Sequence, residues 1–210
     1  SKSSSIKPRV AIRINMNTGI YPSWDRFGFN YENGEAWEAL NRIMLSNVLD
    51  LKGLHTHIGT YILEPSAYHA AASKLAEIAD QLFAKYNLAV EYIDIGGGFA
   101  SKNTMRGTYL PGTDAAPSFE DYAEAITSAL INSSLPPERL PLLVLESGRA
   151  LIDEAGFLLA TILANKRLPD GKRAIIIDAG VNILFTAFWY DHQIAPVKAP
   201  TEMTEETIVY

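Results

Sequence analysis

The stretch Val90-Glu-Tyr-Ile-Asp-Ile-Gly-Gly-Gly-Phe99 is the part of the sequence that decides the fold. Its first half is a short, nearly continuous apolar run, which is typical of a β-strand covered on both faces. Its second half is a triple glycine, which permits a tight turn and lets backbone N–H groups approach an anion such as a phosphate. A tight strand-to-helix turn without a ligand would explain the same glycines, so the motif alone leaves both interpretations open.

Similar apolar runs and helical patterns lie on both sides of this stretch. The other strand-like runs are residues 9–14, 51–58, 141–146 and 173–178. The helical patterns are residues 34–46, 66–86 and 122–131, the last after a capping signal at Ser118. Alternating strands and helices predict parallel strands with right-handed crossovers, as in doubly wound sheets and (β/α)8 barrels. The last two apolar runs are also nearly continuous, so we expect them to be covered on both faces.

The composition is that of an ordinary globular protein and excludes several classes of function. The chain has 210 residues, of which 48% are hydrophobic and 20% charged, and its net charge is −6. The acidic balance disfavours nucleic-acid binding. No apolar run approaches the ~20 residues of a membrane span. There is no cysteine to form a disulfide, a thiolate metal site or a nucleophile. We therefore expect a cytoplasmic protein that binds neither nucleic acid nor a membrane.

Polar residues and glycines follow each of the first four strands at its carboxyl end. Parallel strands bring their carboxyl ends to one edge of the sheet, so we expect these residues to lie close together. They are Arg13 and Asn15, then His55, His57 and Thr60, then Asp94 with Gly96, Gly97 and Gly98, and finally Glu146 and Arg149.

The histidines and Glu146 have competing interpretations. A histidine such as His57 near a strand end is more often a hydrogen-bonded structural residue than a catalytic one. Glu146 ends an apolar run, where burial of a carboxylate is costly unless a partner such as Arg149 is present. The functional alternative is a carboxylate that faces a cationic ring nitrogen. His55 and His57 face the same side of a strand and would suit a metal, but no third ligand lies nearby, so we expect no metal site.

Six short motifs follow one another along the chain in a fixed order. They are Arg13-Ile-Asn15, Arg26-Phe-Gly28, Gly53-Leu-His-Thr-His-Ile-Gly-Thr60, Asp94-Ile-Gly-Gly-Gly-Phe99, Glu146-Ser-Gly-Arg149 and Asp178-Ala-Gly-Val-Asn182. Together they resemble the fold-III decarboxylases that depend on pyridoxal phosphate (PLP), a family that includes diaminopimelate, ornithine and arginine decarboxylases. Their order and spacing agree with the family from about residue 9 to 190, and the resemblance is strongest to the diaminopimelate branch.

The resemblance implies a role for each of the site residues. His57 would stack on the PLP ring, Glu146 would pair with the protonated pyridine nitrogen, and Arg13 would lie near the phenolic oxygen. A carboxylate at this nitrogen keeps it protonated and favours decarboxylation, whereas racemases of the same fold usually place an arginine there. The phosphate would be held by Thr60, where most relatives have serine, by the backbone of Gly96, Gly97 and Gly98, and by Arg149.

The sequence also departs from the family's pattern. The family's Glu-Pro-Gly-Arg has Ser147 in place of proline. Thr186 stands where diaminopimelate decarboxylases have an arginine that binds a substrate carboxylate, so we expect a different amino-acid substrate. Tyr190 is retained, and it joins Thr186 as a candidate substrate residue. The aromatic residues at 185–189 either line a pocket or belong to an ordinary core.

The resemblance assigns the chain to the second half of a (β/α)8 barrel of the alanine racemase-like group. It implies that residues 1–168 hold barrel strands five to eight and bind PLP, and that residues 169–210 begin a C-terminal β-domain. None of the lysines has the family's Lys-Ala-Asn setting, so the lysine that forms the Schiff base is absent and the chain alone would be inactive. We expect it to be part of a longer protein that forms a homodimer.

The leading hypothesis is therefore PLP-dependent decarboxylation of an amino acid. One alternative is a PLP-dependent amino-acid racemase of the same fold, and another is an inactive homologue that acts by binding. A Rossmann-like nucleotide-binding domain is disfavoured, because the triple glycine is neither GxGxxG nor a Walker A loop.

Overall fold

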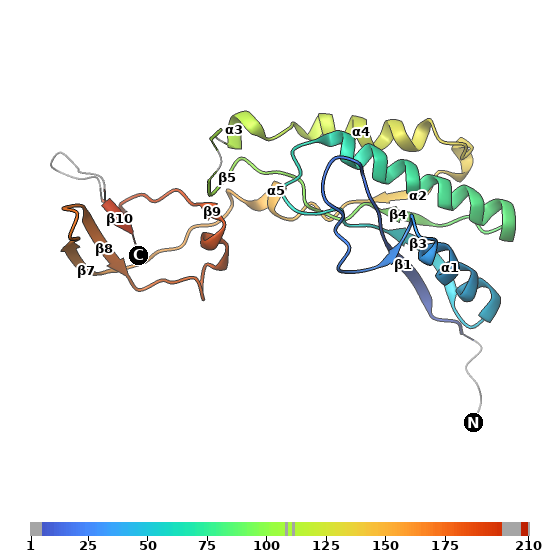
Figure 1. Ribbon diagram of the computed structural model, residues 1–210, viewed down its shortest axis with the longest axis horizontal. Helices are drawn as coiled ribbons and strands as arrows, with labels where there is room; N and C mark the ends of the chain where they lie inside the picture. The colour runs from blue at the N-terminus through green and yellow to red at the C-terminus, as the bar shows by residue number, and fades with distance from the viewer. Residues whose placement is uncertain (1–5, 108, 111, 199–206, 210) are drawn as a thin grey trace, which may run out of the picture. The chain divides into compact units, whose positions relative to one another are not determined.

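The computed structural model describes residues 6–107, 109–110, 112–198 and 207–209 (Figure 1). Contacts divide the chain into two compact units. The first is drawn from Ser1–Ser101 and Ala116–Leu151, and the second from Lys102–Ala115 and Ile152–Tyr210. The domain boundary expected at residue 168 lies in the turn between two strands of the second unit. Those strands, residues 162–167 and 173–177, pair with each other across the expected boundary.

A five-stranded parallel sheet lies at the centre of the first unit. Its order is β2-β1-β3-β4-β6, and each neighbouring pair is parallel. The strands are β1 (Arg9–Asn15), β2 (Phe29–Asn30), β3 (Asp50–His55), β4 (Tyr92–Asp94) and β6 (Leu142–Val144). Four of them were predicted from their apolar runs, and their parallel arrangement is confirmed. The two-residue β2 is too short to give a sequence signal.

Three long helices connect these strands and agree with the predicted patterns. They are α1 (Glu35–Ser46), α2 (Pro65–Tyr86) and α4 (Phe119–Ile131). Pro65 opens α2, where the missing N–H leaves no helical hydrogen bond unmade. Ser118 accepts a hydrogen bond from the backbone of Asp121 and donates its own N–H to the Asp121 carboxylate, which completes a capping box. Helices α2 and α4 lie side by side in Figure 1.

The hydrophobic core lies between the sheet and these helices. Ile14, Leu54 and Ile93 come from three neighbouring strands and are fully buried. Each such side chain contributes about 1.5–3 kcal/mol relative to an exposed position. The other large residues that are fully buried in this cluster are Leu40, Tyr68, Leu75, Leu82, Ile95 and Ile126.

Two of the apolar runs are less covered than their sequences indicate. Leu142 and Leu145 are 69% and 45% exposed, because β6 is the edge strand of the sheet. The run 173–178 does not join the parallel sheet at all. It forms β8 (Arg173–Ile177), which pairs antiparallel with β7 (Ile162–Arg167) in the second unit. Within this chain, neither run is covered on both faces.

The described residues of the second unit form two small sheets. One has the order β10-β8-β7, and the other is the antiparallel pair β5 and β9. The remaining elements in the part of the chain that the structure describes are β5 (Thr104–Met105), α3 (Gly112–Ala115), η1 (Pro137–Arg139), α5 (Arg149–Ile152), η2 (Phe185–Phe188), β9 (Tyr190–Asp191) and β10 (Thr207–Val209). Among the described residues, none of the helices combines the length and the apolar character needed to cross a membrane.

Candidate active site

The carboxyl ends of the neighbouring strands β1, β3, β4 and β6 lie side by side at one end of the parallel sheet, which we call the rim. Backbone hydrogen bonds continue from strand to strand beyond the ladders. Thr56 N donates to Asp94 O at 2.9 Å, and Glu146 N donates to Gly96 O at 2.8 Å. The rim is defined as Arg13, His55, His57, Thr60, Asp94, Gly96, Gly97, Gly98, Glu146 and Arg149.

The three glycines of the rim lie where neighbouring backbones approach too closely for any side chain. A Cβ atom on Gly96 would lie 2.5 Å from Thr56 O, and one on Gly97 would lie 2.3 Å from Glu146 O. A Cβ atom on Gly98 would lie 2.2 Å from a backbone oxygen. Gly96 and Gly98 also have φ angles of +73° and +93°, which favour glycine. Packing therefore requires glycine at all three positions, whether or not they also contact a phosphate.

His57 is held against this turn. Its Nδ1 accepts a hydrogen bond from Gly97 N at 3.2 Å, so the proton of the neutral ring is assigned to Nε2. The Trp24 ring meets it edge-on, with 6.2 Å between ring centroids and 71° between planes. Burial lowers the pKa of His57, and the Arg13 charge lowers it further, although Glu146 acts in the opposite direction. His57 is therefore a neutral, half-buried ring at pH 7.

We expect His57 to titrate below its ordinary value of 6.5, and we expect Arg13→Met to raise that pKa because it removes a neighbouring positive charge. Histidine NMR titration measures both. A folded-state pKa below the unfolded value means that His57 contributes stability above about pH 6.5, which is lost as the pH falls through the folded pKa.

The control is Arg26→Met. Arg26 also lies over the Phe27 ring, at 5.8 Å from its centroid against 5.3 Å for Arg13, but it is not among the charges that act on His57. An equal change of the His57 pKa in both variants would show that Arg13 has no specific effect.

Glu146 lies in a cluster with His55 and Asp94. His55 Nε2 lies 3.9 Å from Glu146 Oε1, and one ligand atom of each residue lies within 4.8 Å of the others. Asp94 is oriented by the backbone N–H of Gly96, which donates to its Oδ1 at 2.8 Å. The premise that no third ligand lies near the histidines is therefore wrong, because parallel strands bring carboxylates from β4 and β6 beside the end of β3. The absence of a metal remains a prediction.

The burial argument for Glu146 also needs correction. Its side chain is 55% exposed, so no desolvation cost forces it to have a partner. Glu146 is exposed because β6 is the edge strand of the sheet, so the end of this strand has a neighbouring strand on one side only.

The remaining predicted cofactor residues have different settings. Arg13 is half-buried near the end of β1, with its guanidinium over the Phe27 ring. Thr60 is exposed in the loop after β3. Its Cα would lie 3.4 Å from a Cβ atom on Gly98, which places it beside the glycine turn. Arg149 is the first residue of α5 and is half-buried.

The two candidate substrate residues, Thr186 and Tyr190, belong to the second unit. Thr186 Oγ1 lies 3.1 Å from His192 Nε2, whereas Tyr190 is buried, with 4% of its surface exposed. Phe185 and Phe188 are mostly exposed, so they do not form an ordinary core within this unit.

Sequence reasoning gave no role to Asn15, which is buried at the end of β1. Its amide donates to Phe27 O at 3.2 Å and to Gly28 O at 3.0 Å. A buried polar side chain must have hydrogen-bond partners, so the amide directly after the apolar Ile14 was the available signal.

Comparisons with known proteins place this geometry in a family. The family model for the pyridoxal-binding domain of pyridoxal-dependent decarboxylases matches residues 2–153. Diaminopimelate decarboxylase from Bacillus subtilis (strain 168) is 29% identical over 158 residues, which cover 75% of this chain and 34% of that protein. The same enzyme from Aquifex aeolicus (strain VF5) is 30% identical over 200 residues, covering 91% and 44%. The chain thus spans less than half the length of these relatives.

Solved structures give the same result. A variant of diaminopimelate decarboxylase from Helicobacter pylori, complexed with L-lysine, matches with a TM-score of 0.72 and 27% identity over 93% of this chain and 47% of that one. The enzyme from M. jannaschii, also with L-lysine, matches with a TM-score of 0.67 and 26% identity over 84% and 40%. Because the family model covers more than half of the sequence, this chain belongs to the pyridoxal-dependent decarboxylases and carries their pyridoxal-binding domain.

Proposed function

We propose that the protein containing this chain is a PLP-dependent amino-acid decarboxylase and that the rim holds the cofactor. One observation carries the proposal. The family match includes every residue of the rim, and within that match hydrogen bonds join the glycine turn to the His57 ring and to the Glu146 backbone.

The chemistry of the rim fits PLP at both ends of the molecule. A phosphate dianion needs N–H donors and a cation, which the backbone of the glycine turn, the Thr60 hydroxyl and Arg149 would supply. A flat heterocycle needs an apolar or aromatic neighbour, and the neutral ring of His57 would provide one. A protonated ring nitrogen needs an anion, and Glu146 would be that anion.

Bound PLP supplies an electron sink for the electron pair that remains on the substrate Cα when CO2 leaves. The residues of the rim would maintain that sink. Glu146 would keep a proton on the ring nitrogen, because a neighbouring carboxylate favours the cationic form. His57 would pack on the ring without adding a positive charge, since it is neutral at pH 7. This arrangement favours decarboxylation over racemisation.

The substrate we propose is an amino acid other than diaminopimelate. The relatives named above are diaminopimelate decarboxylases, but Thr186 gives no cation for a second carboxylate. Tyr190 would remain part of the substrate pocket.

We further propose that the parallel sheet belongs to a (β/α)8 barrel completed by the rest of a longer, homodimeric protein. In that protein residues 1–168 would form the PLP-binding part and residues 169–210 would begin the β-domain. The exposed leucines of the β6 edge, Leu142 and Leu145, support a further neighbour at that edge.

The test is incubation of the full-length protein with PLP and single amino acids, including lysine, ornithine, arginine and diaminopimelate. We expect CO2 release from at least one of them, and we expect Thr186→Arg to improve turnover of diaminopimelate. Loss of substrate chirality without CO2 would indicate the racemase, and PLP binding without turnover would indicate the inactive homologue. Failure to bind PLP would overturn the proposal.

A further inference from the structure

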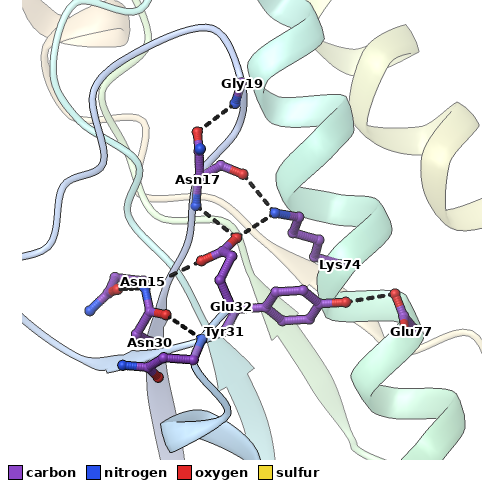
Figure 2. Close-up of polar contacts among 9 residues, drawn as sticks. Asn15, Asn17, Gly19, Asn30, Tyr31, Glu32, Lys74 and Glu77 are labelled. Atoms are coloured by element: carbon purple, nitrogen blue, oxygen red, sulfur yellow. Dashed lines mark hydrogen bonds and ion pairs between the residues drawn. The ribbon is translucent and has the colours of Figure 1, made fainter.

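A hydrogen-bond network connects the end of β1 to helix α2 through the loop that follows β1 (Figure 2). We propose that Asn15 is a positioning residue and that the chain Asn15–Asn30–Glu32–Lys74 holds residues 24–28 against the rim. The inference rests on the proposed function, because it concerns the wall of the same cofactor site.

Asn15 is the centre of the inner half of this network. It is 6% exposed, and both ends of its amide have partners. Its Nδ2 donates to the carbonyl oxygens of Phe27 and Gly28, and its Oδ1 accepts from Asn30 Nδ2 at 2.8 Å. Tyr31 N also donates to Asn15 O at 2.9 Å. A single buried side chain thus fixes both the segment before β2 and β2 itself.

Glu32 and Lys74 form the outer half and attach the loop to α2. Glu32 Oε1 lies 2.5 Å from Lys74 Nζ and accepts from Asn17 N at 3.0 Å, while its Oε2 accepts from Asn30 Nδ2 at 3.2 Å. Lys74 also donates to Asn17 O at 2.6 Å. The two ends of the loop therefore meet at one lysine, as Figure 2 shows.

The aromatic ring of Tyr31 strengthens this attachment. Lys74 Nζ lies 4.9 Å from the centroid of the Tyr31 ring. The Tyr31 hydroxyl donates to Glu77, which is also on α2, at 2.7 Å. Burial raises the pKa of Glu32, but the hydrogen bonds from Lys74 and Asn17 outweigh it, so the pKa of this carboxyl lies below its ordinary value. Glu32 is therefore ionised, and the ion pair persists, across the neutral range.

The segment that the network fixes covers two residues of the rim. Gly28 has a φ of +91°, and a Cβ atom there would lie 2.8 Å from Arg13 O. The Phe27 ring lies 5.3 Å from the Arg13 guanidinium, and the Trp24 ring meets His57 edge-on. Arg13 and His57 thus take part of their surroundings from residues 24–28. The charges that face His57 are Arg13, Glu146, His55 and Asp94, and none of them belongs to the network.

The test compares Lys74→Met with Lys85→Met in the full-length protein. Lys85 is a matched control on the same helix, because its Nζ donates to Asn41 Oδ1 at 3.0 Å and lies 5.2 Å from the Trp37 ring centroid. Lys74→Met removes one charge, two hydrogen bonds and one cation–π contact. Lys85→Met removes one charge, one hydrogen bond and two cation–π contacts, the second of them with Tyr86. Neither lysine belongs to the hydrophobic core, so both proteins should fold.

We expect Lys74→Met to accelerate amide exchange of residues 17–28 in the PLP-free protein and to weaken PLP binding by at least about fivefold. The NMR pKa of His57 should move towards its ordinary value, because residues 24–28 no longer cover the ring fully. Lys85→Met should leave the amide exchange of residues 17–28, the PLP affinity and the His57 pKa unchanged. A residue that only stabilises the fold would not shift the His57 titration.

The outcomes separate this inference from the proposed function. If the wild-type protein binds no PLP, the proposed function fails, while the exchange and titration data still test the positioning role. If the wild-type protein binds PLP and the two lysine variants behave alike, the positioning role is wrong. Faster exchange spread evenly over the whole first unit in Lys74→Met would also contradict it. Asn30→Ala is a second variant that breaks the network between its halves, and it should reproduce the effect of Lys74→Met.

Discussion

Replacement of Gly96 by alanine should both destabilise the first unit and weaken PLP binding by at least tenfold. The new Cβ atom would lie 2.5 Å from Thr56 O, so the ends of β3 and β4 would have to separate. Such overpacking costs about 1–3 kcal/mol. The φ of +73° adds a backbone penalty of about 1–2 kcal/mol for a residue with a side chain. Urea denaturation and PLP titration measure the two effects.

Gly34→Ala is the matched control for this substitution. Gly34 has a φ of +87°, but an added Cβ atom would meet nothing within 4 Å. It should therefore show the backbone penalty without the clash, and PLP affinity should remain that of the wild type. Equal losses in Gly96→Ala and Gly34→Ala would show that close packing of the rim is unimportant.

Glu146→Gln should lower the kcat of decarboxylation about 100-fold, a typical loss when one electrostatic partner of a transition state is removed. Glutamine has nearly the same shape, but it carries no charge to keep the pyridine nitrogen protonated. Because the side chain is 55% exposed, we expect stability to change by no more than about 0.5 kcal/mol. Steady-state kinetics and thermal denaturation of the full-length protein provide the two measurements.

Glu124→Gln, an exposed position on α4, controls for the loss of a negative charge and should leave kcat unchanged. If Glu146→Gln retained the wild-type kcat, Glu146 could not be the partner of the ring nitrogen. The cluster with His55 and Asp94 would then need another explanation.

Local signals were enough to predict the long elements of the first unit. The capping residue Ser118, the helix-opening Pro65 and the apolar runs of β1 and β4 act through neighbours in the sequence, so they can be recognised without the fold. The family resemblance is confirmed by the match over residues 2–153. The order of motifs was informative because five of the six lie at the carboxyl ends of separate strands, whereas Arg26-Phe-Gly28 precedes β2.

Features that depend on position in the sheet could not be predicted in this way. The run ending at Leu145 has the composition of a buried strand, but its exposure follows from the edge position of β6. The residues of the run 173–178 are equally apolar, yet they pair antiparallel in the second unit. The proximity of His55 to Glu146 depends on the register of strands that are far apart in sequence.

The role of Asn15 also could not be predicted from the sequence, because it depends on the fold. Its partners include Phe27, Gly28 and Asn30, and they are reached only when the loop after β1 returns to form β2. A motif can identify such a residue, but only the path of the loop shows what it holds.

PLP titration of the full-length wild-type protein tests the central claim most directly. We predict saturable binding of one PLP per chain, with weaker binding in Gly96→Ala and unchanged binding in Gly34→Ala. The absence of saturable binding, or equal affinity in the wild type and Gly96→Ala, would contradict the assignment of the rim as the cofactor site.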